Sequence, residues 1–280
     1  MTLTRRDVVE LLDRHGLRPS RALGQNFVAD PNTVRRIARL ADVGPGDRVV
    51  EIGAGLGSLT LALAETGASV VAVEKDRHLV PVLRTVVEPA GVRVVEADAL
   101  SLDWAGLLGA DGGWVLVANL PYNVATPLVL DLLDHVPQIR RMLVMVQREV
   151  AERLAAGAGD EAYGAVSVKV AYWAVASVVA RVPASVFVPR PNVESALVSI
   201  ERRPVPAVSD DVDRERLFQL VRAGFATRRK MLRRSLAGLV SDDSAFACAG
   251  VRPEARAEEL DVEAWGRLAA CTTASKPTPS

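Results

Sequence analysis

The sequence has few of the residues that form cross-links or bind metals. Only two of its 280 residues are cysteines, Cys248 and Cys271, and they form no CxxC or CxxxH spacing. We therefore expect neither a disulfide nor a zinc site, and the reducing cytosol fits this composition. The three histidines, His15, His78 and His135, lack ligand spacing too, so the sequence predicts no protein-bound metal.

Long apolar runs are also missing. No stretch approaches the roughly eighteen uncharged apolar residues that indicate a transmembrane helix. The first ten residues include Arg5, Arg6, Asp7 and Glu10 instead of the apolar core of a signal peptide. We expect a cytoplasmic protein that makes no membrane contact.

Neither sign of charge is in excess. The 34 Lys and Arg residues balance 34 Asp and Glu residues, which argues mildly against a nucleic-acid partner, although local clustering decides such binding. With 49% hydrophobic and 24% charged residues, the chain is an ordinary globular sequence. Its length allows one large domain and a small second one.

Short β-branched apolar runs alternate with amphipathic segments from about residue 48, as in a doubly wound α/β sheet. Two further helices, Arg5–Arg14 and Asn32–Leu40, precede the sheet. The sequence predicts a Rossmann-like fold with a seven-stranded, mostly parallel sheet that ends in an antiparallel hairpin. The expected strands are Arg48–Ile52, Ser69–Val73, Val92–Glu96, Trp114–Ala118, Met142–Val146, Val175–Val182 and Ala196–Glu201. The intervening helices are Gly57–Glu65, Arg77–Val87, Pro127–His135 and Glu149–Ala155.

A Pro- and Val-rich break at Arg203–Asp210 marks a domain boundary. We expect the α/β domain, with its N-terminal helical extension, to span residues 1–205. A small helical domain follows at 206–272, and the Ser/Thr/Pro-rich tail at 273–280 is expected to be disordered.

A glycine-rich turn follows the first predicted strand. The run Glu51-Ile-Gly-Ala-Gly-Leu-Gly57 has glycines at Gly53, Gly55 and Gly57, where they permit a tight turn and let a ligand approach the backbone. Such a loop can serve NAD, FAD or S-adenosylmethionine, and many glycine turns bind nothing. The absence of GxGxxG spacing disfavours NAD.

Acidic residues follow the next two predicted strands. A carboxylate at Glu74 can accept hydrogen bonds from both ribose hydroxyls of a cofactor, although a solvated acid at a strand end is the alternative. Asp98 can accept from the adenine amino group of the same cofactor. Because the carboxyl ends of parallel strands meet at one edge, we interpret the ordered set as an S-adenosylmethionine site.

The run Asn119-Leu-Pro-Tyr122 follows the fourth predicted strand and is the most specific motif in the chain. The exocyclic nitrogen of adenine is a poor nucleophile because its lone pair is delocalised. Two acceptors aimed at its N–H groups, the Asn119 amide oxygen and the Leu120 carbonyl, would stabilise the charge that develops during methyl transfer. Pro121 stiffens this turn, and Tyr122 offers a ring face to the target base. The alternative is an Asn-capped proline turn before a helix.

Four segments together resemble the KsgA/RsmA family of small-subunit ribosomal RNA adenine dimethyltransferases. These are Leu23–Phe27, Glu51–Gly57, Asn119–Asn123 and Val188–Ser195. The resemblance covers about residues 18–260. It implies dimethylation of N6 of two adjacent adenosines in a hairpin loop near the 3′ end of 16S rRNA, with S-adenosylmethionine as methyl donor. It also implies action on the immature small ribosomal subunit and a role in its biogenesis.

The resemblance also implies roles for individual residues. Val28 departs from the family's usual leucine. The change has no effect if the contact with the cofactor runs through the backbone, and it shifts the affinity slightly if the side chain packs on the cofactor. Phe187 resembles a second aromatic that would sandwich a flipped adenine opposite Tyr122, and hydrophobic packing is the alternative. Asn26 belongs to a Gln-Asn pair that in another context would only cap a helix. The implied cofactor contacts are Asn26, Val28, Gly53, Glu74, Asp98 and Asn119.

Basic residues cluster after the domain boundary. If Arg214–Leu239 is helical, several of them share one face and suit an RNA backbone, and a solvated helix face is the alternative. The cluster comprises Arg222, Arg228, Arg229, Lys230, Arg233 and Arg234.

Other functions stay open at this point. Erm-type methylases of 23S rRNA resemble the chain through the sheet, but the segments that begin at Leu23 and Pro189 look more like KsgA. DNA adenine methylases share the Asn-x-Pro-Tyr chemistry but usually carry a recognition domain for which this chain has no room. A chiefly non-catalytic ribosome-assembly factor is the third alternative. We expect a monomer, as suits a protein that docks on a ribosomal particle.

Overall fold

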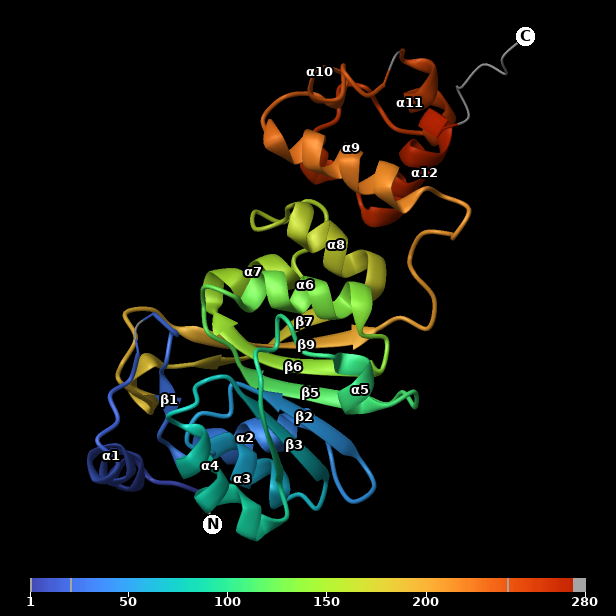
Figure 1. Ribbon diagram of the computed structural model, residues 1–280. Coiled ribbons are helices and arrows are strands. Elements are labelled where there is room, and N and C mark those ends of the chain that lie inside the picture. Colours follow the sequence, from blue (N-terminus) through green and yellow to red (C-terminus); the bar gives the residue numbers. More distant parts are fainter. Residues whose placement is uncertain (1, 21, 241, 274–280) are drawn as a thin grey trace. The chain divides into compact units, whose positions relative to one another are not determined.

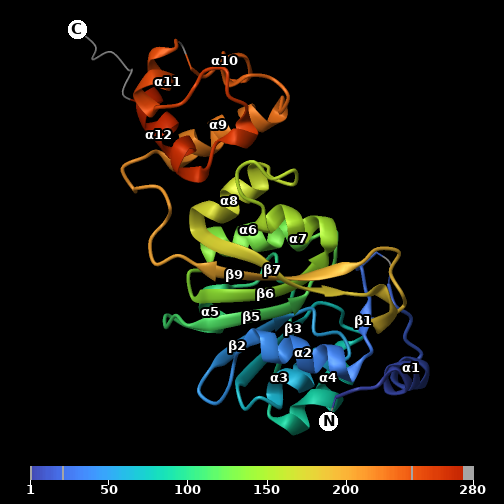
Figure 2. The same ribbon diagram turned by 180° about the vertical axis from the view of Figure 1, so that it is seen from behind.

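The computed structural model describes residues 2–20, 22–240 and 242–273. The chain divides into two compact units (Figures 1 and 2). The first comprises the chain up to Ala151 together with Ser177–Arg202, and the second comprises Glu152–Ala176 together with the chain from Arg203 onward. The tail that the sequence predicts to be disordered lies, apart from Thr273, outside the described residues.

The second junction lies close to the boundary expected near residue 205, but Glu152–Ala176 groups with the C-terminal helices and not with the sheet. The reason is packing. Tyr163, Val168 and Tyr172 are buried in the same hydrophobic cluster as Trp265 of the C-terminal region. The second unit is therefore assembled from two stretches of the chain.

A seven-stranded sheet in the order β4-β3-β2-β5-β6-β9-β7 forms the centre of the first unit. The strands from β2 to β6 pair in parallel, and β9 runs antiparallel to β6. This confirms the predicted Rossmann-like fold. The bounds are β2 (Arg48–Ile52), β3 (Ser69–Glu74), β4 (Arg93–Glu96), β5 (Trp114–Asn119), β6 (Ile139–Gln147), β7 (Ala174–Val182) and β9 (Ser195–Arg202).

The central strands are apolar along their length because both faces of the sheet are covered. Val115 and Leu116, which are neighbours on β5, are both fully buried. Helices α2, α3 and α4 pack on the face that carries Val115, and the ribbon views show α5 and α6 on the other face. The helices are α1 (Arg5–Arg14), α2 (Pro31–Ala41), α3 (Ser58–Ala64), α4 (Val80–Val87), α5 (Trp104–Leu108), α6 (Ala125–His135) and α7 (Arg148–Ala155), with a short 3-10 turn at Glu88–Ala90.

A second, two-stranded sheet joins distant parts of the first unit, and the sequence did not predict it. In it β1 (Phe27–Val28) pairs antiparallel with β8 (Phe187–Val188), which follows a 3-10 turn at Ala184–Val186. Two-residue strands carry no alternation of apolar and polar positions, so no periodicity reveals them.

The second unit is helical, and its core is rich in aromatic side chains. Trp265 is fully buried, and the rings of Tyr163 and Phe225 meet edge to face with centroids 5.8 Å apart. Gly224 has no room for a side chain, since a Cβ there would lie 2.6 Å from the Trp265 ring. The elements are α8 (Ala165–Trp173), α9 (Arg214–Ala226), α10 (Leu232–Ser235), α11 (Ser244–Ala249), a 3-10 turn (Ala257–Glu259) and α12 (Val262–Thr273).

The helical reading of Arg214–Leu239 is wrong in its centre. Helix α9 ends at Ala226, and Met231 forms an antiparallel bridge with Arg256 before α10 begins. The Leu232 amide donates to the Ala255 carbonyl at 2.8 Å. These tertiary hydrogen bonds replace helical ones, so the clustered basic residues do not share one helix face.

The expectation of unpaired cysteines is also wrong. Cys248 of α11 and Cys271 of α12 form a disulfide, with their Cα atoms 6.0 Å apart. The two helices pack against each other, which brings together residues 23 positions apart in sequence. Sequence spacing alone does not reveal such a contact.

No helix within the described ranges is long and apolar enough to cross a membrane.

Candidate active site

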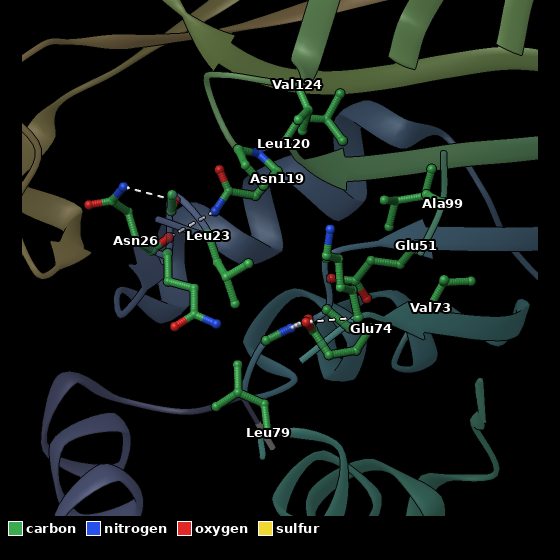
Figure 3. A pocket seen from close by; sticks show the side chains of 18 of the residues that line it. Leu23, Asn26, Glu51, Val73, Glu74, Leu79, Ala99, Asn119, Leu120 and Val124 are labelled. Carbon is green, nitrogen blue, oxygen red and sulfur yellow. Dashed lines mark hydrogen bonds between the residues drawn. The ribbon is translucent and has the colours of Figure 1, made fainter. Parts of the chain in front are cut away.

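A pocket opens at the carboxyl ends of β2, β3 and β5, the edge of the sheet that the sequence predicts to bind a ligand (Figure 3). The glycine loop, the segment Ala22–Val28, the residues after β3 and β4, and the turn Asn119–Val124 line it. The pocket therefore brings together every predicted cofactor residue and the whole Asn-Leu-Pro-Tyr motif.

The glycine loop passes directly beneath the N-terminal segment. Gly55 has a φ of +59°, and a Cβ on it would lie 2.9 Å from two ring carbons of Phe27. Gly53 and Gly57 also have positive φ, at +71° and +90°. Conformation and space thus both require glycine at position 55.

Glu74 shapes this loop from the neighbouring strand. One carboxylate oxygen accepts the Gly55 N–H at 2.8 Å, and the other accepts those of Lys75 and Asp76 at 2.9 Å each. Burial raises the pKa of Glu74, although the three backbone donors oppose that shift. The side chain is 7% exposed, and it still lines the pocket.

Asp98 lies in the pocket wall after β4 and has a partner that the sequence did not reveal. Lys75 donates to its carboxylate at 2.7 Å, and the Leu100 amide donates at 3.1 Å. The Lys75 ammonium and this amide lower the pKa of Asp98. The group is therefore an ionised acceptor at the pocket edge.

Glu51 is a pocket residue that sequence reasoning missed. It is 2% exposed, and its Oε2 atom is buried without a hydrogen-bond partner among the described residues. Burial raises its pKa to about 8, and the nearby Glu74 carboxylate adds to the shift. Its position at the start of the glycine motif was the only sequence signal for a role in ligand binding. An acidic residue inside an apolar strand did not by itself indicate such a role.

The N-terminal segment is tied to both sides of the pocket. Gln25 donates from its side-chain amide to Asp76 at 2.8 Å, and it accepts the Ser20 amide at 2.7 Å. Gly24 packs against the turn Asn119–Val124, since a Cβ there would lie 3.0 Å from the Pro121 Cβ. Val28 is buried in the core and also lines the pocket.

The side-chain amide of Asn119 has a defined orientation. Its Nδ2 donates to the backbone carbonyl of Asn26 at 2.9 Å (Figure 3). A flipped amide would place two oxygens against each other, so this contact identifies nitrogen and oxygen. The Oδ1 atom is the group left for a ligand in the pocket.

The rest of the motif forms a rigid turn. The Leu120 amide donates to Met145 at 3.0 Å, and the Pro121 carbonyl accepts the amides of Val124 and Ala125 at 3.1 Å each. Tyr122 is partly exposed, and burial of its other part raises the pKa of its phenol.

Comparison with known proteins decides the family. A family model described as ribosomal RNA adenine dimethylase matches residues 17–273. The chain belongs to this family. Its members are enzymes that methylate adenine in ribosomal RNA, so this chain is a methyltransferase with S-adenosylmethionine as its methyl donor.

Relatives in the family cover nearly the whole chain. The chain is 50% identical to the ribosomal RNA small subunit methyltransferase A of Kineococcus radiotolerans, over 96% of this chain and 91% of that protein. It is also 50% identical to the Cutibacterium acnes protein of the same name, over 90% and 88%.

Solved structures show the same fold. The 23S rRNA methyltransferase ErmE is 26% identical with a TM-score of 0.68, over 89% of this chain and 100% of that one. A dimethyladenosine transferase from Plasmodium falciparum is 23% identical with a TM-score of 0.71, over 86% and 95%.

The pocket of this family member suits its cofactor chemically. S-adenosylmethionine carries an ammonium and a sulfonium, and a cation beside the buried Oε2 of Glu51, which has no partner among the described residues, would favour the ionised form of this carboxyl. Ser58 lines the same pocket, and its buried hydroxyl also has no partner within the part of the chain that the structure describes. Leu79 and Ala99 add apolar walls (Figure 3).

Among the residues predicted to contact the cofactor or the target base, Phe187 does not line the pocket. Its side chain is 1% exposed and packs in the hydrophobic core with Val28 and Leu197. It pairs with Val28 through the backbone. The packing alternative therefore describes its position, and the sandwich with Tyr122 is not formed here.

The predicted RNA-binding residues fall into two groups in the second unit. Arg228 pairs with Glu258 at 2.6 Å, and Arg233 pairs with Glu254 at 3.5 Å. The others are exposed, and no acidic partner is found for them among the described residues. These are Arg222, Arg229, Lys230 and Arg234.

Proposed function

We propose that this enzyme transfers methyl groups from S-adenosylmethionine to N6 of two adjacent adenosines near the 3′ end of 16S rRNA, in the immature small subunit. The observation that supports it best is the fixed amide of Asn119 beside the pocket. An acceptor held in place before the reaction costs no reorganisation when charge develops.

The cofactor would be held by the groups at the sheet edge. Glu74 would accept from the ribose hydroxyls, and Asp98 would accept from the adenine amino group. Asn26, Val28 and the glycine loop at Gly53 and Gly55 would enclose the remainder. When bound, S-adenosylmethionine supplies an electrophilic methyl group on a sulfonium.

The residues of the motif would activate the target base. Oδ1 of Asn119 and the carbonyl of Leu120 would each accept one N–H of the adenine amino group, which favours a pyramidal nitrogen and stabilises its growing positive charge. Pro121 would hold that carbonyl in place, and the Tyr122 ring would stack on the base. No general base is needed before attack, because the proton leaves afterwards from a strongly acidic ammonium.

The second unit would hold the RNA. Arg222, Arg229, Lys230 and Arg234 are exposed cations that can contact phosphates. Arg228 and Arg233 would contribute less, since each already has a carboxylate partner.

The choice of substrate rests on the pattern of similarity. The relatives at about half identity carry the name of small-subunit methyltransferases, whereas the 23S methyltransferase ErmE is 26% identical. With this ribosomal substrate, we expect the enzyme to act in the cytoplasm as a monomer.

The test is methylation of defined particles. Purified protein would be incubated with labelled S-adenosylmethionine and unmethylated small subunits, large subunits or DNA, and the label would be mapped. We expect dimethyladenosine at two adjacent positions of small-subunit RNA. Label in large-subunit RNA would identify an Erm-type enzyme instead, and cofactor binding without any labelled product would point to an assembly factor.

One substitution links the activity to the motif. Asn119→Ala removes the oriented acceptor and should lower kcat by about 100-fold or more while particle binding persists. Asn32→Ala, which changes an exposed asparagine of α2, is the matched control and should leave kcat unchanged. Equal kcat values for the two variants would remove Asn119 from the reaction.

A further inference from the structure

The hydroxyl of Tyr122 has a partner that no role yet explains. It lies 2.9 Å from the Oγ atom of Ser195, the first residue of β9. Ser195 is fully buried, and the three residues after it, Ala196, Leu197 and Val198, are apolar and buried. A hydroxyl in such surroundings requires a hydrogen-bond partner, and among the described residues Tyr122 provides it.

Ser195 is itself held firmly. It pairs with Gln147 at the end of β6. The preceding residue, Glu194, accepts the Arg148 amide at 3.0 Å and forms an ion pair with the Arg148 side chain at 3.3 Å. The Ser195 hydroxyl therefore sits at a fixed point of the sheet.

The hydrogen bond removes a freedom that the turn leaves to Tyr122. Backbone hydrogen bonds at Leu120 and Pro121 fix the main chain, but the tyrosine ring can still rotate about its two side-chain torsions. A bond at the far end of the ring, through its hydroxyl, fixes the first torsion, which would otherwise swing that hydroxyl away from Ser195. The second torsion turns the ring about the axis that passes through the hydroxyl, so the bond limits it only weakly. The direction in which the ring points is then set by β9 as well as by the turn.

We propose that Ser195 is a positioning residue that fixes the direction in which the Tyr122 ring points, so that a stacked base presents its amino group to Asn119. The inference rests on the proposed function, in which Tyr122 stacks on the target adenine. Ser195 touches neither base nor cofactor in this role and acts only through Tyr122. Its loss should therefore affect the alignment of a bound base and leave cofactor affinity unchanged.

The test is a double-mutant cycle on kcat for unmethylated small subunits. Ser195→Ala and Tyr122→Phe each remove one hydroxyl, and each should lower kcat about three- to tenfold, the value of one hydrogen bond. The KM for particles and the Kd for S-adenosylmethionine should stay at their original values. The double variant should be no slower than the slower single variant, because both changes remove the same contact.

Ser199→Ala is the matched control, since it removes another serine hydroxyl from the same strand. If Ser195→Ala equals Ser199→Ala in kcat, or if the two losses multiply in the double variant, the inference is overturned. Tyr122→Phe removes the same bond from the tyrosine side, so the cycle stays decisive even if Ser195→Ala folds poorly. Absence of methylation by the unmodified protein would instead overturn the proposed function.

Discussion

Glu51 and Glu74 are two buried carboxyl groups on neighbouring strands at the floor of one pocket. Glu74 has three backbone donors to stabilise its charge, whereas the Oε2 atom of Glu51 has no partner among the described residues. Burial raises the pKa of Glu51 to about 8, and no backbone donor among the described residues opposes that shift, as three do at Glu74. A cationic ligand beside Glu51 would favour its ionised form and would offset the free-energy cost of burying that charge.

The buried carboxyl makes stability depend on pH. Its pKa in the folded protein is about 8, against 4.5 for the ordinary value, so its contribution is complete below about pH 4.5 and is lost as the pH rises through 8. Glu51→Gln stays neutral and lacks this loss. Relative to the variant, the unmodified protein should lose on the order of a few kcal/mol of unfolding free energy between pH 5 and pH 9.

Urea unfolding without cofactor at the two pH values measures this difference. Glu96→Gln, which removes an exposed carboxyl at the end of β4, serves as the control. A difference between the unmodified protein and Glu51→Gln that does not change with pH would contradict the assignment of a buried, neutral carboxyl.

At the level of elements, the glycine loop packs closely against Phe27 of β1, at Gly55. Gly55→Ala combines a positive φ with a Cβ placed 2.9 Å from the buried Phe27 ring. Gly16→Ala has a similar φ of +61° but open space around it. Both variants should lose about 1–2 kcal/mol for backbone conformation, and Gly55→Ala should lose about 1–3 kcal/mol more for the displaced ring.

Unfolding by urea separates these two costs, and calorimetric titration follows the cofactor. Gly55→Ala should also bind S-adenosylmethionine more weakly, because a displaced loop would move the backbone N–H that orients Glu74 in the pocket. Equal stability losses at positions 16 and 55 would show that the ring does not confine the loop.

The elements also show what the sequence could and could not predict. Strands such as Arg48–Ile52 were predicted because a buried parallel strand is apolar along its whole length, and their order placed Glu74, Asp98 and Asn119 at one edge. The pairing of β1 with β8 and the hydrogen bond that Asn119 donates to the Asn26 carbonyl join residues far apart in sequence. Such contacts depend on tertiary packing and leave no local pattern.

Helix α9 illustrates the opposite error. The pattern of Arg214–Leu239 permits a continuous helix, but Met231 and Leu232 form hydrogen bonds with the segment around Ala255 instead. Tertiary contacts with this segment end the helix, and helix propensity, which depends only on the local sequence, does not predict them. Arg228 and Arg233 form ion pairs with glutamates, whereas the neighbouring basic residues form none within the described part of the chain, and the amino-acid composition does not reveal this difference.

At the scale of the molecule, a net charge of zero conceals an uneven distribution. In the second unit, acidic residues such as Glu254, Glu258 and Glu259 balance Arg233, Arg228 and Arg252 through ion pairs. The remaining exposed cations are then available for a polyanion. Local pairing, and not total charge, decides which cations can contact RNA.

Salt dependence of binding tests this distribution. Each phosphate contact adds roughly 0.7–0.9 to the slope of log K against log salt concentration, because it releases bound counterions. Replacing Arg229, Lys230 and Arg234 together by alanine should therefore make the slope for unmethylated small subunits shallower by about 2–3. Arg252→Ala, at a position already paired with Glu259 at 2.8 Å, should leave the slope unchanged. If the triple variant keeps the original slope, these three residues do not contact the RNA phosphates. This conclusion holds whatever the overall affinity, because the slope depends on the number of contacts.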